Sequence, residues 1–238
     1  MGQGRGPDKE ASLTEVVAHR GSAQLTRENT LEAFVAAREL GADGIELDVH
    51  LSRDGAVVVH HDADVPGQGP IAELDSSDLP GWLPRLEEAL EVSAPCWVNV
   101  EIKCETLANA AAALLCSKVA ALVSSRRELV PVVVSSFSLA ALDTVRACKS
   151  DISTALLIEP AEDALEALAT ARGHGHNSLH PFFVSVDQAL MEAAEAAAVA
   201  IRPWTVDDPD RVAALAALGV DAVITNDVVG ALRALGRS

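Results

Sequence analysis

From about residue 13 onward, the sequence alternates short runs rich in Val and Ile with longer Ala- and Leu-rich stretches of helical periodicity. This alternation predicts βα units, in which parallel strands are joined by crossover helices. The predicted strands are 15–19, 44–50, 56–60, 97–103, 130–136, 153–158, 178–184, 200–206 and 221–225. The predicted helices are 29–40, 86–92, 105–127, 138–148, 161–172, 187–199, 208–218 and 227–235, with Gly41, Gly173 and Gly219 as expected C-terminal stops.

The number of units favours a closed barrel. If 44–50 and 56–60 are counted as one strand that bends at the Asp54-Gly55 turn, the nine predicted strands give eight βα units. Eight units fit a (β/α)8 TIM barrel of roughly 250 residues. A doubly wound open sheet is the alternative, but no glycine-rich phosphate loop follows the first strand. We therefore expect an α/β fold with a single barrel domain over 13–238. Residues 1–12 should be a disordered tail, and the Pro-, Gly- and acid-rich segment 62–85 an insertion loop over the barrel mouth.

The composition restricts the compartment and the partners. The chain has 238 residues, 49% of them hydrophobic, and can bury a large core without disulfides. Its four cysteines form no CxxC pair, so we expect reduced thiols and a cytoplasmic location. No signal-like or membrane-length apolar stretch is present, which argues against export and membrane insertion. A formal net charge of -17 without runs of Lys or Arg argues against nucleic acid, and an anionic small-molecule substrate would need a compact site with specific cations.

Charged residues gather where the first predicted strands end. His19 and Arg20 follow the first strand, at the end of a barrel where enzymes place catalytic groups. Taken alone, this pair also fits a histidine bonded to backbone groups beside a surface arginine. In the next strand, Glu46 and Asp48 are two residues apart and share one face, while apolar residues occupy the other. Two carboxylates side by side in a barrel interior require a cation to offset the cost of burial.

A third carboxylate follows the same logic. Glu101 and Lys103 lie two residues apart near the end of the strand at 97–103. With Glu46 and Asp48, Glu101 would complete an oxygen-ligand cluster suited to Mg²⁺ or Ca²⁺, and no His/Cys set is spaced for zinc. Lys103 is then a second cation for phosphate beside Arg20, or alternatively a simple ion-pair partner of Glu101.

Two adjacent histidines end the run AVVVHHD, and strand alternation allows only one of them to face the mouth. We favour His61, next to Asp62, over His60. Another histidine, His180, falls at the end of a predicted strand without an evident partner, which favours a structural or surface role. His174 and His176 form an HxH pair in a glycine-rich loop that would need further ligands to bind a metal.

The strings HRG, ENT, GADGIELDV and DGAVVVHHD resemble the signature of the glycerophosphodiester phosphodiesterase family. Its members are metal-dependent (β/α)8 barrels that cleave glycerophosphodiesters to an alcohol and glycerol phosphate. The match is dense over 16–62 and continues in VNVEIK, VVVSSF, RPWTVDD and GVDAVITND.

The resemblance implies a role for each matching residue. His19 and His61 would be the acid–base pair, and Glu46, Asp48 and Glu101 the ligands of one divalent cation, Mg²⁺ or Ca²⁺. Arg20 and Lys103 would bind the phosphate. Glu28 and Asn29 would brace the first loop, and Trp204 would line the alcohol side of the substrate.

The chain departs from the family pattern at three places. Arg27 stands where the family usually has proline, and Asn226 where it often has aspartate, so a bracing contact at the last strand is expected to differ. Segment 62–85 lacks the family's Arg-Thr-Thr-Gly-like stretch, which leaves the leaving-group preference open. One alternative function is a related lyase that uses the same residues but stops at a cyclic phosphate. A second is an inactive barrel that binds a phosphodiester or a metal; it would lack at least one of the seven acid–base, metal-binding and phosphate-binding residues, and all seven are present.

Overall fold

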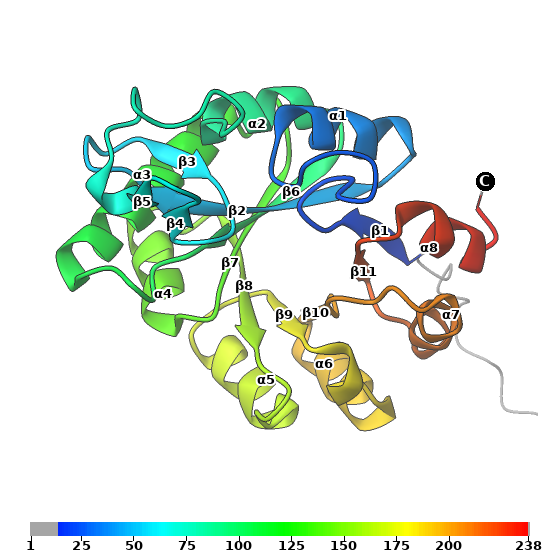
Figure 1. Ribbon diagram of the computed structural model, residues 1–238. Coiled ribbons are helices and arrows are strands. Elements are labelled where there is room, and N and C mark those ends of the chain that lie inside the picture. Colours follow the sequence, from blue (N-terminus) through cyan, green and yellow to red (C-terminus); the bar gives the residue numbers. More distant parts are fainter. Residues whose placement is uncertain (1–13, 238) are drawn as a thin grey trace, which may run out of the picture.

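The computed structural model describes residues 14–237, and the predicted tail at 1–12 lies outside the described residues. Within that range, eight parallel strands follow one another in the order β10-β9-β8-β7-β6-β2-β1-β11, with helices around them (Figure 1). These strands are β1 (Glu15–Ala18), β2 (Gly44–Leu51), β6 (Trp97–Ile102), β7 (Val132–Ser136), β8 (Ser153–Ile158), β9 (Ser178–Pro181), β10 (Ala200–Ile201) and β11 (Ala222–Thr225). The predicted (β/α)8 TIM barrel is confirmed.

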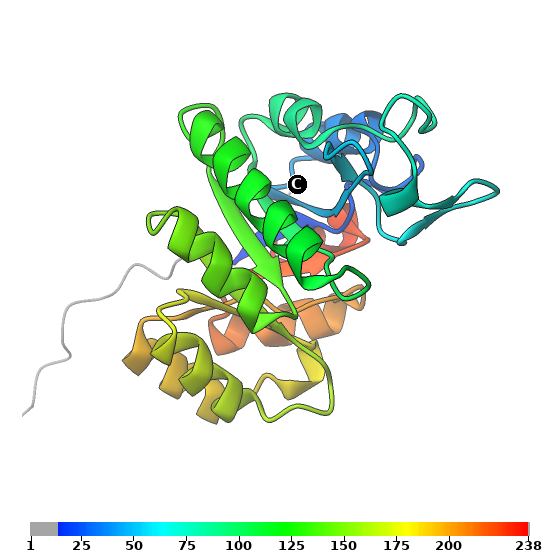
Figure 2. The same ribbon diagram turned by 90° about the vertical axis from the view of Figure 1, so that its left-hand side faces the viewer.

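One helix follows each parallel strand, as the periodicity predicts. The helices are α1 (Leu31–Glu39), α2 (Leu86–Ser93), α3 (Asn109–Arg126), α4 (Leu139–Cys148), α5 (Ala164–Gly173), α6 (Gln188–Ala197), α7 (Pro209–Leu218) and α8 (Val228–Ala234). Figure 2 shows α3 and α4 side by side across the outer face of the barrel. Gly219 caps α7 in the left-handed conformation, as predicted. After α5, the glycine with a positive φ is Gly175 rather than the predicted Gly173.

The main core lies between the barrel wall and the helices. On β2, the alternate residues Ile45, Leu47 and Val49 are fully buried and pack in this core. Glu46 and Asp48, on the other face of the strand, are also buried. The predicted division of β2 into an apolar face and an acidic face is therefore present, and the acidic face points into the barrel.

The hairpin expected at Asp54-Gly55 is present. Strand β3 (Val57–Val59) pairs antiparallel with the end of β2. The following segment contains a two-stranded ribbon of β4 (Asp64–Val65) and β5 (Gly69–Pro70) and a short 3-10 turn at Ile71–Glu73. Val65, Ile71 and Leu83 form a second small core with β3. Segment 62–85 is thus a folded insertion that packs beside β3.

The barrel closes between β10 and β11 through single hydrogen bonds rather than a regular ladder. Asp221 N–H donates to Ile201 O at 3.0 Å, and Ile224 N–H donates to Pro203 O at 2.9 Å. The strands predicted at 178–184 and 200–206 were too long. Regular pairing ends at Pro181 in β9 and at Ile201 in β10, and an isolated bridge between Phe182 and Trp204 follows.

Two further observations concern expectations about the compartment. All four cysteines are free, and three of them, Cys96, Cys104 and Cys116, are buried. Within residues 14–237, no helix combines the length and the apolar character that a membrane span requires.

Candidate active site

The HRG sequence makes a tight turn that fixes Glu46. Arg20 and Gly21 both have positive φ, at 55° and 80°. A Cβ on Gly21 would lie 2.8 Å from Ala33, so only glycine fits there without a shift of the backbone. The turn directs the backbone N–H of Arg20 to Glu46 Oε2, at 2.9 Å. The other oxygen, Glu46 Oε1, is buried and accepts no hydrogen bond.

The ENT sequence holds the other side of the same site. Asn29 adopts a left-handed conformation, which asparagine tolerates better than most residues, and its Nδ2 donates to Asp48 Oδ2 at 2.8 Å. Glu28 accepts a hydrogen bond from the Arg20 guanidinium at 3.0 Å. Thr30 caps α1 by accepting from Ala33 N–H. This element therefore makes one contact with Asp48, one with Arg20 and one with the start of α1.

Glu46, Asp48 and Glu101 form the predicted carboxylate cluster. One oxygen from each residue lies within 4.8 Å of the others, and all three residues are buried. Parallel pairing of β2 with β6 sets Asp48 directly opposite Glu101. Burial and the neighbouring negative charges raise the pKa of Glu46 well above its usual value. Burial and the charge of Asp48 raise the pKa of Glu101 to about 7, although Lys103 acts in the opposite direction.

Two cationic side chains border the cluster. Lys103 forms ion pairs with Glu101 and, at 3.2 Å, with Asp48 Oδ1. Arg20 Nε lies 3.4 Å from Asp48 Oδ2. Burial alone would raise the pKa of Asp48, but the charges of Lys103 and Arg20 outweigh it and hold that pKa below its usual value. The ion pair considered for Lys103 in the sequence is present, and its side chain also lines the cavity described below.

His19 is held by a chain of two hydrogen-bonded side chains. Asn226 Nδ2 donates to Asp207 Oδ2 at 2.8 Å, so Asn226 Oδ1 is left to accept, and it lies 2.8 Å from His19 Nδ1. In the neutral ring, Nδ1 therefore carries the proton and Nε2 is free to accept one. Burial, and then the charge of Arg20, lower the pKa of His19. Asp207 was not singled out in the sequence, although it lies in the RPWTVDD string.

The two adjacent histidines separate as expected. His61 lines the cavity, and its Nδ1 lies 2.8 Å from Asp62 Oδ1. His60 instead packs edge-on against Trp82, with ring centroids 5.6 Å apart. Asp62 can accept the Nδ1 proton of His61, which directs the other ring nitrogen of His61 away from this carboxylate.

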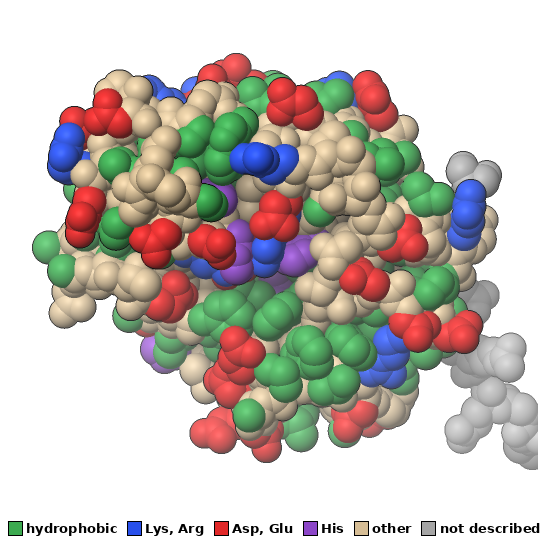
Figure 3. All heavy atoms as spheres, viewed as in Figure 1, with side chains coloured by type: hydrophobic (Ala, Val, Ile, Leu, Met, Phe, Trp, Pro, Cys, Tyr) green, Lys and Arg blue, Asp and Glu red, His purple; other side chains and the backbone are tan. Residues whose placement is uncertain are grey.

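A cavity of about 210 Å³ brings these groups together. In Figure 3, histidine and Lys/Arg side chains meet at the bottom of a hollow whose rim carries acidic and apolar groups. Seven of the nine predicted site residues line the cavity, and the two that do not are Asp48 and Glu28. The lining residues are His19, Arg20, Glu46, His61, Asn99, Glu101, Lys103, Phe137, Leu157, Glu159, Trp204 and Ile224. A larger hollow of about 880 Å³ is lined by none of the predicted residues.

The remaining predicted residues lie close to the cavity. Asp48 is almost completely buried beneath it, in the carboxylate cluster. Glu28 forms an ion pair with the Arg20 guanidinium at 3.0 Å.

Trp204 is held by a hydrogen bond from its ring N–H to His180 O at 2.8 Å. His180 is fully buried, so the surface role considered for it is wrong.

Comparison with known proteins identifies the family. A model of the Glycerophosphoryl diester phosphodiesterase family matches residues 19–229. The chain belongs to this family. It is 33% identical to a glycerophosphodiester phosphodiesterase of Caldanaerobacter subterraneus subsp. tengcongensis, over 90% of this chain and 94% of that protein. The expected family and enzyme class are thereby confirmed.

Solved structures of the family have the same fold. A phosphodiesterase of Oleispira antarctica, in complex with the product sn-glycerol-3-phosphate, superposes with a TM-score of 0.84 and 25% identity, over 94% of this chain and 97% of that one. The glycerophosphodiester phosphodiesterase of Thermotoga maritima gives a TM-score of 0.75 and 28% identity, over 91% and 96%.

Proposed function

We propose that this chain hydrolyses glycerophosphodiesters to an alcohol and glycerol 3-phosphate, with His19 and His61 as the acid–base pair. The observation that carries the proposal is the cavity in which both histidines face a buried carboxylate cluster and two cationic side chains. An inactive binding barrel would need none of this acid–base arrangement. A small glycerophosphodiester fits the volume of the cavity better than a macromolecule does.

The hydrogen bonds favour His19 as the general base and His61 as the general acid. His19 has a lowered pKa and an unprotonated Nε2, so it can take a proton from the attacking water. His61 Nδ1 lies 2.8 Å from Asp62 Oδ1, and this contact orients the ring so that its other nitrogen can give a proton to the leaving alkoxide. Water adds to phosphorus as the bond to the alcohol oxygen breaks, and the products are the alcohol and glycerol 3-phosphate.

The carboxylate cluster fits one divalent cation. Glu46 Oε1 is buried without a hydrogen bond, and burial together with the neighbouring carboxylates raises the pKa values of Glu46 and Glu101. A set of only oxygen donors suits Mg²⁺ or Ca²⁺. When bound, the ion would supply positive charge that stabilises the phosphoryl oxygens during attack. Arg20 and Lys103 add fixed positive charge at the same wall.

The substrate's alcohol side is assigned to the aromatic wall. Trp204 packs edge-on against Phe137 and Phe182, each with ring centroids 5.6 Å away. This wall can contact the leaving group without forming charge interactions. The Oleispira relative contains the product sn-glycerol-3-phosphate, which supports glycerol 3-phosphate as a product of this chain.

A coupled assay for glycerol 3-phosphate tests the proposal. The purified chain is given glycerophosphodiesters with different head groups, with Mg²⁺, with Ca²⁺ and with chelator. We expect metal-dependent release of glycerol 3-phosphate, and a loss of roughly 10²- to 10⁴-fold in kcat for His19→Ala and for His61→Ala. The control is His174→Ala, which removes a half-exposed histidine far from the cavity lining.

Two results would contradict the proposal. One is the absence of glycerol 3-phosphate with every head group and both metals. The other is a cyclic phosphate as the only product in phosphorus NMR, which would identify a lyase that uses the neighbouring hydroxyl of the substrate as nucleophile. Unchanged turnover in His19→Ala would refute the assignment of the base.

The proposed setting is the cytoplasm. Four free cysteines, three of them buried, fit a reducing compartment. The net charge of -17 also supports a small-molecule substrate over nucleic acid.

A further inference from the structure

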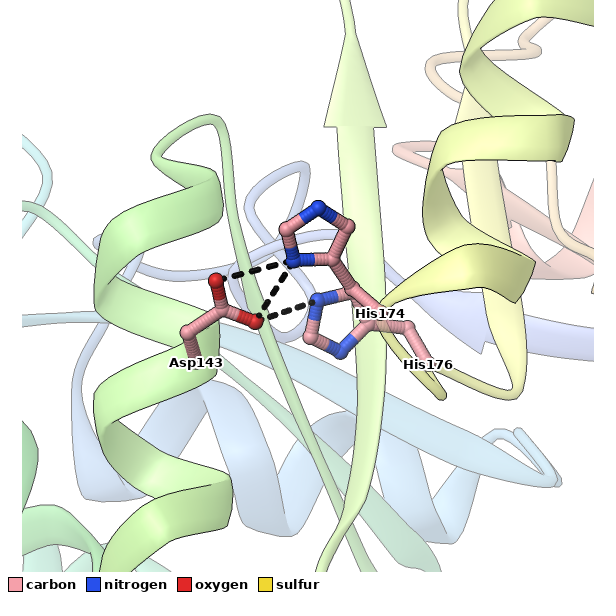
Figure 4. Close-up of side chains that lie close together, drawn as sticks. All are labelled: Asp143, His174 and His176. Atoms are coloured by element: carbon pink, nitrogen blue, oxygen red, sulfur yellow. Dashed lines mark hydrogen bonds and ion pairs between the residues drawn. The ribbon is translucent and has the colours of Figure 1, made fainter.

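A second cluster of metal-ligating side chains lies outside the candidate active site. It consists of Asp143 on α4, His174 at the end of α5 and His176 in the loop before β9 (Figure 4). His174 Nδ1 lies 2.9 Å from Asp143 Oδ2, and His176 Nε2 lies 3.5 Å from Asp143 Oδ1. The two imidazole rings are stacked with an interplanar angle of 16°. All three side chains therefore converge on one point.

The loop conformation explains why both histidines point the same way. Gly175, between them, has a φ of +80°, which other residues rarely adopt. The chain therefore turns back after His174 and brings His176 beneath it. Sequence spacing alone could not reveal the third member, because Asp143 lies on a different helix 31 residues before His174.

His176 carries the observation that points to a ligand. Its side chain is completely buried, and its Nδ1 is engaged with Thr154 Oγ1 at 2.9 Å. Its other nitrogen, Nε2, is buried without a hydrogen bond and faces Asp143. A buried nitrogen that makes no hydrogen bond and lies 3.5 Å from a carboxylate oxygen is poorly satisfied, and a metal bound at Nε2 would remove that cost. Histidine ligands of metals commonly donate the remaining ring N–H to a second residue, and Thr154 is placed to accept it.

We propose that Asp143, His174 and His176 form a binding site for a transition-metal ion of the zinc type. Two imidazole nitrogens and one carboxylate oxygen are ligands that zinc prefers, and a fourth tetrahedral position is left for water. Ligands about 2.0–2.1 Å from a tetrahedral ion are about 3.3 Å apart. Asp143 Oδ1 lies 3.1 Å from His174 Nδ1 and 3.5 Å from His176 Nε2, so its two separations lie on either side of this value. Asp143 and His174 have 43% and 42% of their side chains exposed, so an ion can enter from solvent.

The site lies at the opposite end of the barrel from the phosphodiesterase cavity. Thr154 is near the start of β8, and His176 precedes β9, whereas the catalytic residues follow the ends of β1 and β3. A bound ion would join α4 to the loop between α5 and β9. Its effect is therefore on stability rather than on the phosphodiesterase reaction.

Arg146 gives the site an internal test. Its guanidinium lies beside Gly175, 2.9 Å from where a Cβ of that residue would be. Its positive charge disfavours further positive charge on His176. A metal ion held by the cluster would be repelled by this charge. Arg146→Gln should therefore bind zinc more tightly than the natural chain, whereas an Asp143–His174 contact that serves only as a structural ion pair predicts no such gain.

The experiment measures Zn²⁺ binding to the full chain by competition with a chromogenic chelator, in excess Mg²⁺ to occupy oxygen-rich sites. We expect His174→Ala and Asp143→Asn to weaken binding by at least roughly 10- to 100-fold, the effect that loss of an outer-shell partner alone produces. Asp151→Asn is the matched control, because it also removes one exposed carboxylate, which pairs with Arg127. Phosphodiesterase activity should be unchanged in His174→Ala.

Two further readouts keep the proposal falsifiable. At zinc about 100-fold above Kd, the natural chain should gain roughly 5–10 °C in Tm and His174→Ala should not. Zinc-soaked crystals should show an anomalous peak among the three side chains. The proposal is overturned if zinc binding is equal in the natural chain, His174→Ala and Asp143→Asn. It is also overturned if the peak appears only at the Glu46, Asp48 and Glu101 cluster.

Discussion

The hydrogen bond from His19 to Asn226 allows the basicity of His19 to be changed by a single substitution. In Asn226→Asp, a carboxylate oxygen would replace the amide oxygen that now lies 2.8 Å from His19 Nδ1. The protonated form of His19 would then face a full negative charge instead of a neutral amide. The pKa of His19, which is lowered in the natural chain, should therefore rise.

The size of the rise follows from the distance. Two opposite unit charges about 4 Å apart attract by about 1 kcal/mol in water and about 4 kcal/mol at an effective dielectric of about 20. Since 1.36 kcal/mol corresponds to about one pKa unit, the expected rise is about 1–3 units. The base must be unprotonated to act, so activity is lost as pH falls through this pKa. The acidic limb of kcat/KM should thus move to higher pH by about 1–3 units.

The assay is a pH–rate profile with saturating metal. Asp207 complicates the single variant, because the carboxylates at positions 207 and 226 would face each other across the present 2.8 Å hydrogen bond. The double variant, Asn226→Asp with Asp207→Asn, exchanges the two groups and retains both hydrogen bonds. Asn226→Ala should lower the rate without an upward shift of the limb. An acidic limb that stays in place in both the single and the double variant, while they remain folded, would refute His19 as the base.

Three further predictions concern the scaffold of the site. Because Glu101 has a pKa of about 7 without metal and must be ionised to bind one, Mg²⁺ affinity measured by calorimetry should fall as pH decreases below 7, and this dependence should be smaller in Glu101→Gln. Asn29→Ala should leave the buried Asp48 carboxylate with one donor fewer and cost about 1–3 kcal/mol in urea unfolding; a change below about 0.5 kcal/mol would contradict this role. Gly21→Ala should cost at least about 1 kcal/mol and lower kcat, because its Cβ would meet Ala33 at 2.8 Å; wild-type Tm and turnover would show that the turn is not constrained.

Local patterns were sufficient to predict the fold and the carboxylate cluster. The alternation of acidic and apolar residues on β2 predicted that Glu46 and Asp48 share a face, and the ladder between β2 and β6 brings Glu101 beside them. Periodicity placed the helices within a few residues of their observed ends. The strand predicted at 200–206 was too long because a Val/Ile run does not reveal which N–H groups find ladder partners near Pro203.

The remaining contacts depend on three-dimensional proximity. Asp207 and Asn226 are 19 residues apart, and Asn226 and His19 are 207 apart, so no local spacing marks them as one unit. The same is true of Asp143 and the two histidines of the HxH pair. The sequence names these residues, but only the closure of the barrel and the packing of α4 show which of them meet.

The closure of the barrel has a consequence for substrate choice. The wall that holds the carboxylates is a continuous ladder of six paired residues between β2 and β6, whereas β10 and β11 are joined only by isolated bonds. Amide hydrogens around residues 200–206 should therefore exchange with solvent before those of β2. Trp204 belongs to this looser side. With Trp204 on the alcohol side, as proposed above, substitutions that adapt the chain to a different alcohol can accumulate there without disturbing the carboxylates on the rigid side.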